Sequence, residues 1–160
     1  MIGYHGYRSL AFLGELAAPD IGARFKGFQV ALAAHGLPVP EEPFDTTVLT
    51  QDSLRSLRDA IASGDLPDAL VCATDQLALT VLDLLARHDI RVPRDVAVTG
   101  FDGIIAGRLS NPTLTTVRQP FASMGRLAVR ILTDTAAGLG HPKSYVLPTR
   151  VVIGGSCGCL

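Results

Sequence analysis

The stretch DALVCATDQLALTVLDLLARHDIRVPRDVAVTGF, Asp68 to Phe101, contains the pattern that decides the fold. It begins with the apolar run DALVCAT and ends with a second one, DVAVTGF, and between them Leu77, Val81 and Leu84 recur at helical spacing. Short apolar runs are typical of buried strands, and the spacing between them is that of an amphipathic helix. Strand, helix and strand in this order predict a βαβ unit of a parallel sheet.

The segments before this stretch continue the same alternation. SLAFLG (9–14) is another short apolar run closed by glycine. Asp20 can cap a helix that runs to about His35, and Thr50 can cap a second helix that Gly64 ends. These signals predict one more strand and two more helices upstream.

The segments after it are extended or helical. LTTVRQP (114–120) is extended, a helical pattern covers 121–138, and SYVLPTRVVIGG (144–155) is extended again. With the upstream elements, this predicts an α/β fold, an open and mainly parallel sheet with helices on both faces.

Composition and charge exclude several classes of protein. Of the 160 residues, 48% are hydrophobic and 18% are charged, which excludes disorder. No apolar stretch approaches the roughly 20 residues of a membrane helix, and residues 1–10 carry no secretory signal pattern. The net charge is −1 and the basic residues do not cluster, so this chain alone is not expected to bind nucleic acid.

The three cysteines predict a reducing compartment and no metal site. Cys72 lies in an apolar run, whereas Cys157 and Cys159 form a C-x-C tail, and no disulfide framework is visible. Two sulfurs without nearby His or Cys partners make an incomplete coordination set. We therefore expect a cytoplasmic protein without metal or other cofactor.

Polar residues gather where the predicted strands end. Arg24 follows the first strand, Thr74 and Asp75 follow the second, and Asp102 follows the third. Ligands of open α/β sheets bind beyond the carboxyl ends of the strands. A guanidinium with carboxylates suits a polyhydroxylated or heterocyclic small molecule, because the first donates paired hydrogen bonds and the second accept them.

Each of these residues also has a structural alternative. Arg24 is otherwise a solvated residue early in its helix, Asp75 a helix N-cap, and Asp102 a turn-forming residue at a strand end. Their convergence on one edge of the sheet favours the binding role.

The chain resembles the C-terminal two-thirds of the sensor domain of LacI/GalR-type transcription regulators. VPRDVAVTGFD (92–102) combined with LTTVRQP is the most specific part of the resemblance. The other matching segments, in the family's order, are GYRSLAFLG (6–14), RFKGFQVALAAHGL (24–37), ALVCATDQLAL (69–79), NPT (111–113), GRLAVRILTD (125–134) and LPTRVVIGGSCG (147–158).

The resemblance implies a periplasmic-binding-protein-like sensor that binds a sugar, nucleoside or purine between two lobes. A preceding helix-turn-helix head and hinge would bind operator DNA as a homodimer. By this resemblance, effector contacts fall on Arg24, Asp102 and Thr74, which precedes Asp75. Leu49 takes the place of the family's stacking aromatic, and Gln119 lies near the crossover between lobes.

Three departures leave the effector's identity open. Thr74 stands where asparagine is usual, Leu49 where tryptophan or phenylalanine is usual, and Gly103 where a second acid often follows. A pyranose that relies on aromatic stacking and an amide contact is therefore less assured.

The resemblance also divides the chain. Residues 1–119 correspond to the C-terminal lobe, 120–143 to a crossover helix that packs on the N-terminal lobe, and 144–160 to the return strand and tail. The head, the hinge and most of the N-terminal lobe have no counterpart here. The apolar stripe of the crossover helix therefore packs against a second copy, or back onto this lobe.

Other functional classes match less well. GGSCG (154–158) has the G-x-S-x-G form of a nucleophile elbow, but such an elbow needs a helix, an acid and a histidine after it, so we expect no enzyme. The alternative is a sugar-binding protein of an ABC-type transporter, which shares the two-lobed fold. A third reading takes Met1 as the true start of a headless remnant that acts through dimerisation.

Overall fold

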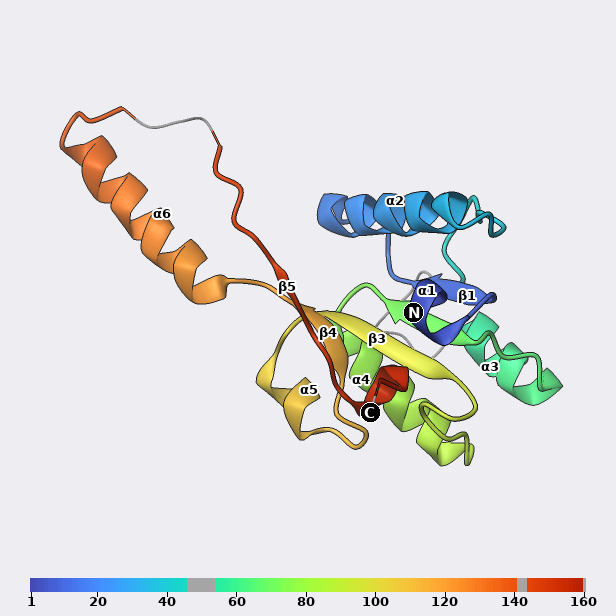
Figure 1. The fold of residues 1–160 in the computed structure, drawn as a ribbon. Coiled ribbons are helices and arrows are strands. Elements are labelled where there is room, and N and C mark those ends of the chain that lie inside the picture. Colours follow the sequence, from blue (N-terminus) through green and yellow to red (C-terminus); the bar gives the residue numbers. More distant parts are fainter. Residues whose placement is uncertain (46–53, 141–143, 160) are drawn as a thin grey trace.

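Five strands form one sheet in the computed structural model, which describes residues 1–45, 54–140 and 144–159 (Figure 1). The strands are β1 (Leu10–Leu13), β2 (Ala69–Cys72), β3 (Ala97–Asp102), β4 (Thr115–Arg118) and β5 (Arg150–Val152). The helices are α1 (Ile2–His5), α2 (Pro19–Ala34), α3 (Arg55–Ser63), α4 (Asp75–Arg87), α5 (Ile105–Leu109), α6 (Phe121–Ala136) and the short 3-10 turn η1 (Gly155–Cys157).

The sheet is parallel except at one edge. The strand order is β1-β2-β3-β4-β5, in which β1 to β4 are parallel and β5 is antiparallel to β4. Leu10, Ala69 and Ala97 are aligned at the beginnings of their strands, so the carboxyl ends of these strands meet at one edge of the sheet. The predicted open, mainly parallel sheet is confirmed.

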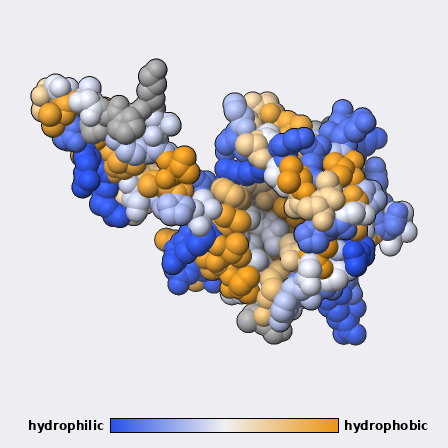
Figure 2. Space-filling view, turned by 45° about the horizontal axis from the view of Figure 1, so that its top comes forward, coloured by the Kyte–Doolittle hydropathy of each residue, from blue (hydrophilic) through white to orange (hydrophobic). Residues whose placement is uncertain are grey.

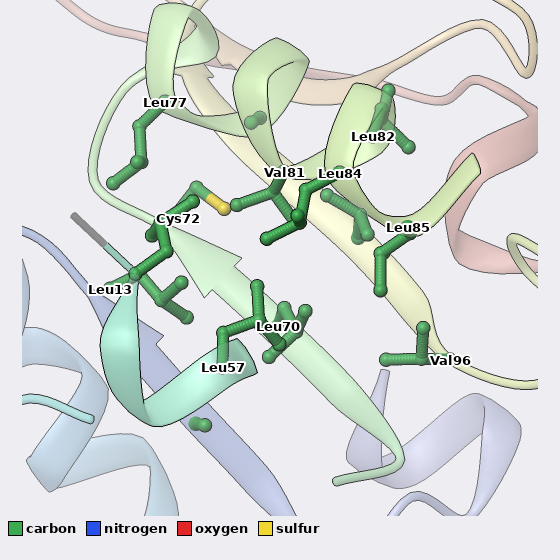
Figure 3. Close-up of a cluster of buried hydrophobic side chains, with 14 of the residues drawn as sticks. Leu13, Leu57, Leu70, Cys72, Leu77, Val81, Leu82, Leu84, Leu85 and Val96 are labelled. Carbon is green, nitrogen blue, oxygen red and sulfur yellow. The ribbon is translucent and has the colours of Figure 1, made fainter. Parts of the chain in front are cut away.

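Helices cover both faces of the sheet, each over its own apolar cluster. On one face, α3 and α4 pack on the strands with Leu57, Leu77 and Leu85, which are almost completely buried against Leu70 and Val98 (Figure 3). On the other face, α2 supplies the second cluster, built from Phe12, Phe25, Phe28, Leu32 and Ala73. Burying each large aliphatic side chain stabilises the fold by roughly 1.5–3 kcal/mol, so the lobe has a core of its own.

The helix α6 stands apart from this core. It projects away from the sheet at the end of the crossover from β4, and none of its residues is buried (Figure 1). The chain returns beside its own departure point, because Arg118 of β4 pairs with Arg150 of β5. The expectation that the helix folds back onto this lobe is therefore wrong.

Gly64 ends α3 as predicted, whereas the predicted N-cap Asp20 differs from the observed one. The helix α2 begins at Pro19 after Ala18, so Asp20 lies in its first turn and does not cap it. Proline at the first helical position explains this start, because its fixed φ suits the helix and its missing N–H costs no bond there. Thr50 lies outside the described residues. Among the described helices, none is long and apolar enough to cross a bilayer.

Candidate functional site

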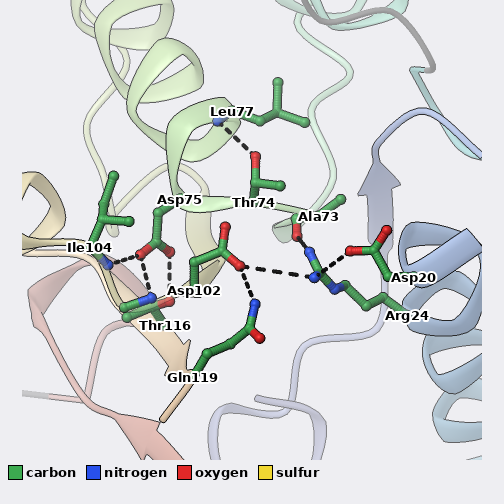
Figure 4. A network of polar contacts seen from close by, with 11 residues as sticks. Asp20, Arg24, Ala73, Thr74, Asp75, Leu77, Asp102, Ile104, Thr116 and Gln119 are labelled. Carbon is green, nitrogen blue, oxygen red and sulfur yellow. Dashed lines mark hydrogen bonds and ion pairs between the residues drawn. The ribbon is translucent and has the colours of Figure 1, made fainter. Parts of the chain in front are cut away.

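Arg24 lies against the ends of the strands. Its Nη1 donates a hydrogen bond to the carbonyl of Ala73 (2.6 Å), and its Nη2 donates to Oδ2 of Asp20 (2.7 Å), one helical turn earlier (Figure 4). The guanidinium carbon stands 4.0 Å from the ring centroid of Phe101, within the range of a cation–π contact. Because only 15% of its side chain is exposed, the alternative of a solvated helix residue is wrong.

Asp102 ends β3 beside this guanidinium. Its Oδ1 lies 3.9 Å from Nη2 of Arg24 and accepts a hydrogen bond from Nε2 of Gln119 (2.7 Å). Its backbone has φ 118°, and Gly103 follows with φ 75°, so the chain turns sharply here. Burial raises the pKa of Asp102, although the Gln119 hydrogen bond and the Arg24 charge oppose this rise.

Gln119 is joined to Asp102 twice. Besides the side-chain contact, its backbone N–H donates to the carbonyl of Asp102 (3.0 Å). Gln119 directly follows β4 and precedes α6, so the crossover begins at the polar cluster formed by Arg24, Asp102 and Gln119 (Figure 4).

Thr74, and not Asp75, caps the helix that follows the second strand. Thr74 is the N-cap of α4, and its Oγ1 accepts from the N–H of Leu77 (3.2 Å). Asp75 is the first residue of that helix, so the alternative that Asp75 is the N-cap is wrong.

The carboxylate of Asp75 is fully buried and holds the next loop in place. It accepts hydrogen bonds from the N–H groups of Gly103 (2.7 Å) and Ile104 (2.8 Å) and from the hydroxyl of Thr116 (2.5 Å). Asp75 therefore lies behind Asp102 and fixes the loop that follows it.

Close packing against β4 and a positive φ both favour glycine at position 103. A Cβ there would lie 2.8 Å from Cα of Arg118, and φ 75° would strain any other residue. A side chain at this position would therefore clash with the backbone of Arg118. Leu49, the remaining predicted site residue, lies outside the described residues.

Two partners of Arg24 escaped the sequence analysis. Asp20 and Arg24 are separated by four residues, the spacing of an ion pair on a helix, and this signal was present in the sequence. Phe101 belongs to a predicted buried strand, and no local pattern indicates that it faces a guanidinium from α2.

The surface is hollowed on both sides of the polar cluster. A hollow of about 580 Å³ lies over the face of the sheet that α2 covers in part, and its lining is mainly apolar, as Figure 2 shows. A second hollow, of about 640 Å³, borders Gln119, Gly103, Arg118 and Arg150. The second is the better match to a hydroxyl-rich ligand, because its walls carry hydrogen-bonding groups.

The G-x-S-x-G segment has a structural role. Ser156 is fully buried, its hydroxyl donates to the carbonyl of Val98 (2.6 Å), and it accepts from the N–H of Thr115 (2.9 Å). The segment forms the short turn η1, with no α-helix after the serine in the described tail. This geometry differs from that of a nucleophile elbow.

The cysteine tail has a neighbour that the sequence analysis did not foresee. Nε2 of His5 lies 2.9 Å from Sγ of Cys159, although 154 positions separate them. The expectation that no histidine lies near the two tail sulfurs is wrong, since folding brings the first helix to the last turn.

Comparison with known families and relatives agrees with this geometry. Residues 4–157 match the family model described as a periplasmic binding protein-like domain. The chain is 34% identical over 122 residues to the HTH-type transcriptional repressor MelR of Bacillus subtilis, which covers 76% of this chain and 36% of MelR. It is 30% identical over 130 residues to the repressor PurR of Pasteurella multocida, covering 80% of this chain and 39% of PurR.

Solved structures share the fold. A LacI-type transcription regulator from Bifidobacterium animalis subsp. lactis superposes with a TM-score of 0.80 at 32% identity, over 97% of this chain and 60% of that one. The regulator CelR in complex with cellobiose gives 0.81 at 30% identity, over 97% of this chain and 48% of that one. The chain thus spans little more than a third of the length of MelR and PurR.

Proposed function

Because the chain belongs to the LacI/GalR family, as a part of its periplasmic-binding-protein-like sensor domain, we propose that it binds a small metabolite at the carboxyl edge of its sheet. The effector is a sugar, a nucleoside or a purine, held between this lobe and a second one. Binding modulates the affinity of the whole regulator for operator DNA.

One observation carries this proposal. Arg24 and Asp102 come from different elements and lie 3.9 Å apart, with Gln119 bonded to Asp102. The cluster offers donors and acceptors at an edge where two hollows meet the strand ends. Such a set matches vicinal hydroxyls or ring N–H groups, and a catalytic nucleophile is not required for it.

The remaining predicted residues take supporting roles in the proposal. Thr74 and Leu49 complete the contacts with the effector. Asp75 supports the site from behind, because its carboxylate holds the loop after Asp102. Gln119 connects the effector to the crossover that leads to α6.

The partners of the whole protein follow from the same family. We propose a cytoplasmic homodimer that meets operator DNA through a helix-turn-helix head outside these 160 residues. The relatives described above are transcription repressors or regulators, which favours this reading over a transporter's sugar-binding protein.

Ligand-observed NMR on the 160-residue chain tests the effector site, since saturation-transfer signals detect the weak binding expected of half a cleft. A panel of neutral sugars, nucleosides and purines is compared on wild type, Arg24→Ala and Asp102→Asn. The matched control is Arg87→Ala, which removes an exposed guanidinium paired with Asp83 on α4.

We expect one ligand class to give saturation transfer with wild type and Arg87→Ala, and at least a tenfold weaker response with both site variants. A ligand that binds all four proteins equally well would remove the site assignment.

A further inference from the structure

Three metal-ligating side chains meet at the edge of the sheet opposite the polar cluster. The Nε2 or Nδ1 atom of His5 and the Sγ atoms of Cys157 and Cys159 all lie within 4.8 Å of one another. The turn η1 is bonded near the beginnings of β3 and β4, through Val98 and Thr115, whereas Asp102 ends β3. The three side chains and Asp102 therefore lie toward opposite ends of the strands, although the hollow of about 580 Å³ reaches from Arg24 to Cys157 and Cys159.

We propose that His5, Cys157 and Cys159 form a binding site for a thiophilic metal ion, with Zn²⁺ as the ion it suits best. Two thiolates and one imidazole are ligands that Zn²⁺ prefers. The site is independent of the proposed effector function and links the first helix of the chain to its last turn.

The position of Cys157 is fixed by the sheet. It follows Ser156, whose hydroxyl bridges Val98 and Thr115, and its own side chain is 1% exposed. Gly158 then has φ 83°, a conformation that glycine adopts without strain. This turn brings Cys159 back beside Cys157 and His5.

The imidazole is held by two tyrosines. The ring of His5 stacks on Tyr7 with centroids 5.1 Å apart, and Tyr4 meets it edge-on at 4.9 Å. The hydroxyl of Tyr7 also donates to the carbonyl of Cys157 (3.2 Å), so the ring and the tail share one support. Residues that orient ligands in this way are a regular part of metal sites.

The separations are close to those of a coordinated ion. With Zn–S about 2.3 Å and Zn–N about 2.0–2.1 Å, tetrahedral ligand atoms lie roughly 3.4–3.8 Å apart. In this structure Nε2 of His5 lies 2.9 Å from Sγ of Cys159, and all three ligand atoms lie within 4.8 Å of one another. These separations span the distances expected around a bound ion. The fourth position is left to water or an exogenous ligand.

The test uses the 160-residue chain, freed of metal with a chelator and kept under a phosphine reductant. Titration with Co²⁺ reports thiolate ligands through a sulfur-to-cobalt charge-transfer band, and Zn²⁺ then displaces the cobalt. We expect one equivalent to bind, with release of protons from the thiols and a rise in thermal stability.

Single-site variants identify the ligands. His5→Gln and Cys159→Ser should each weaken Co²⁺ and Zn²⁺ binding by more than about 100-fold, beyond the usual effect of residues that only orient a ligand. His88→Gln, at the exposed end of α4, is the matched control and should bind as wild type does.

The proposal fails if the charge-transfer band is absent from wild type, or if Cys159→Ser or His5→Gln binds Co²⁺ as tightly as wild type does. Cys157→Ser is also informative, but this buried position affects folding. The partly exposed His5 and Cys159 keep the test decisive, once circular dichroism shows that their variants are folded.

Discussion

Asp75 and Asp102 show how two carboxylates at one edge of a sheet acquire different roles. Asp75 is fully buried, and its carboxylate accepts hydrogen bonds from three donors. The side chain of Asp102 is 21% exposed and contacts Arg24 and Gln119. The first shapes the loop, and the second is available to a ligand.

Replacing Asp75 by alanine should destabilise the lobe. The N–H groups of Gly103 and Ile104 and the hydroxyl of Thr116 would lose their acceptor inside the protein. Because a buried donor left unpaired costs about 1–3 kcal/mol, we expect the free energy of unfolding to fall by about 3 kcal/mol. Urea unfolding followed by circular dichroism measures it.

Asp83→Ala is the matched control for this change. Asp83 pairs with Arg87 on the exposed face of α4, so its loss should change the free energy of unfolding by less than about 1 kcal/mol. Equal effects of the two substitutions would contradict the role given to Asp75.

Asp102 should give the stability a dependence on pH. Its pKa is raised in the folded state, so the folded chain binds more protons than the unfolded chain above pH 3.8, its ordinary pKa. Relative to Asp102→Asn, wild type should lose stability as pH rises above 3.8 and level off beyond the folded pKa. Urea unfolding at a series of pH values checks this.

Asp68 provides a control, because its pKa is shifted in the direction opposite to that of Asp102. The N–H groups of Ser9 and Arg8 hold its pKa below 3.8, so its contribution is present above pH 3.8 and disappears as pH falls through the folded pKa. Asp68→Asn should therefore differ from wild type in the opposite direction and at lower pH. The same slope for both variants would refute the assignment for Asp102.

At the scale of single elements, α6 carries a surface without a partner. Phe121, Met124, Val129 and Leu132 are between 43% and 69% exposed. An apolar stripe of this kind on a soluble domain marks an interaction site, and the second lobe or a second copy of the chain can cover it.

We predict that the isolated chain self-associates through α6. Met124→Ser combined with Leu132→Ser should weaken the dimer at least tenfold in analytical ultracentrifugation, because both side chains leave water on association. Leu109→Ser on α5, at a residue 81% exposed, is the control and should leave association unchanged. A wild-type chain that is monomeric in analytical ultracentrifugation would contradict the prediction.

Local patterns predicted most elements and several of their ends, but not every helix cap. The strand 68–74 and the helix after it appear where their apolar spacing placed them, because burial on one or both faces imposes that spacing. The cap of α4 was harder to predict, since Thr74 and Asp75 are both good cap residues, and the carboxylate of Asp75 instead accepts from Thr116, 41 positions away. The meeting of His5 with Cys159 depends on the whole fold and leaves no local signal.

At the scale of the whole molecule, the chain is one lobe with a projecting helix. It has an apolar core on each face of its sheet, and α6 projects away from both (Figure 1). The exposed apolar surface of α6 lies on the crossover that starts at Gln119. The site and the unpartnered helix are thus adjacent along the chain.

The chain alone should not bind duplex DNA. With a net charge of −1 it cannot neutralise several phosphates on one face. Fluorescence anisotropy with a labelled duplex at about 150 mM salt should give a Kd weaker than about 10⁻⁴ M, the weak end of nonspecific binding. Tighter binding that falls steeply with added salt would show a basic surface that the sequence does not reveal.

The C-terminal segment, residues 150–157, determines when the sheet can be completed during synthesis. Thr115 receives its buried hydroxyl partner from Ser156, and β4 gains its outer neighbour only with Arg150–Val152. Because these contacts join residues far apart in the chain, closing them is a late step. A nascent chain arrested after Ala136 should stay sensitive to protease, and resistance should appear only when residues beyond Cys157 have emerged from the ribosome.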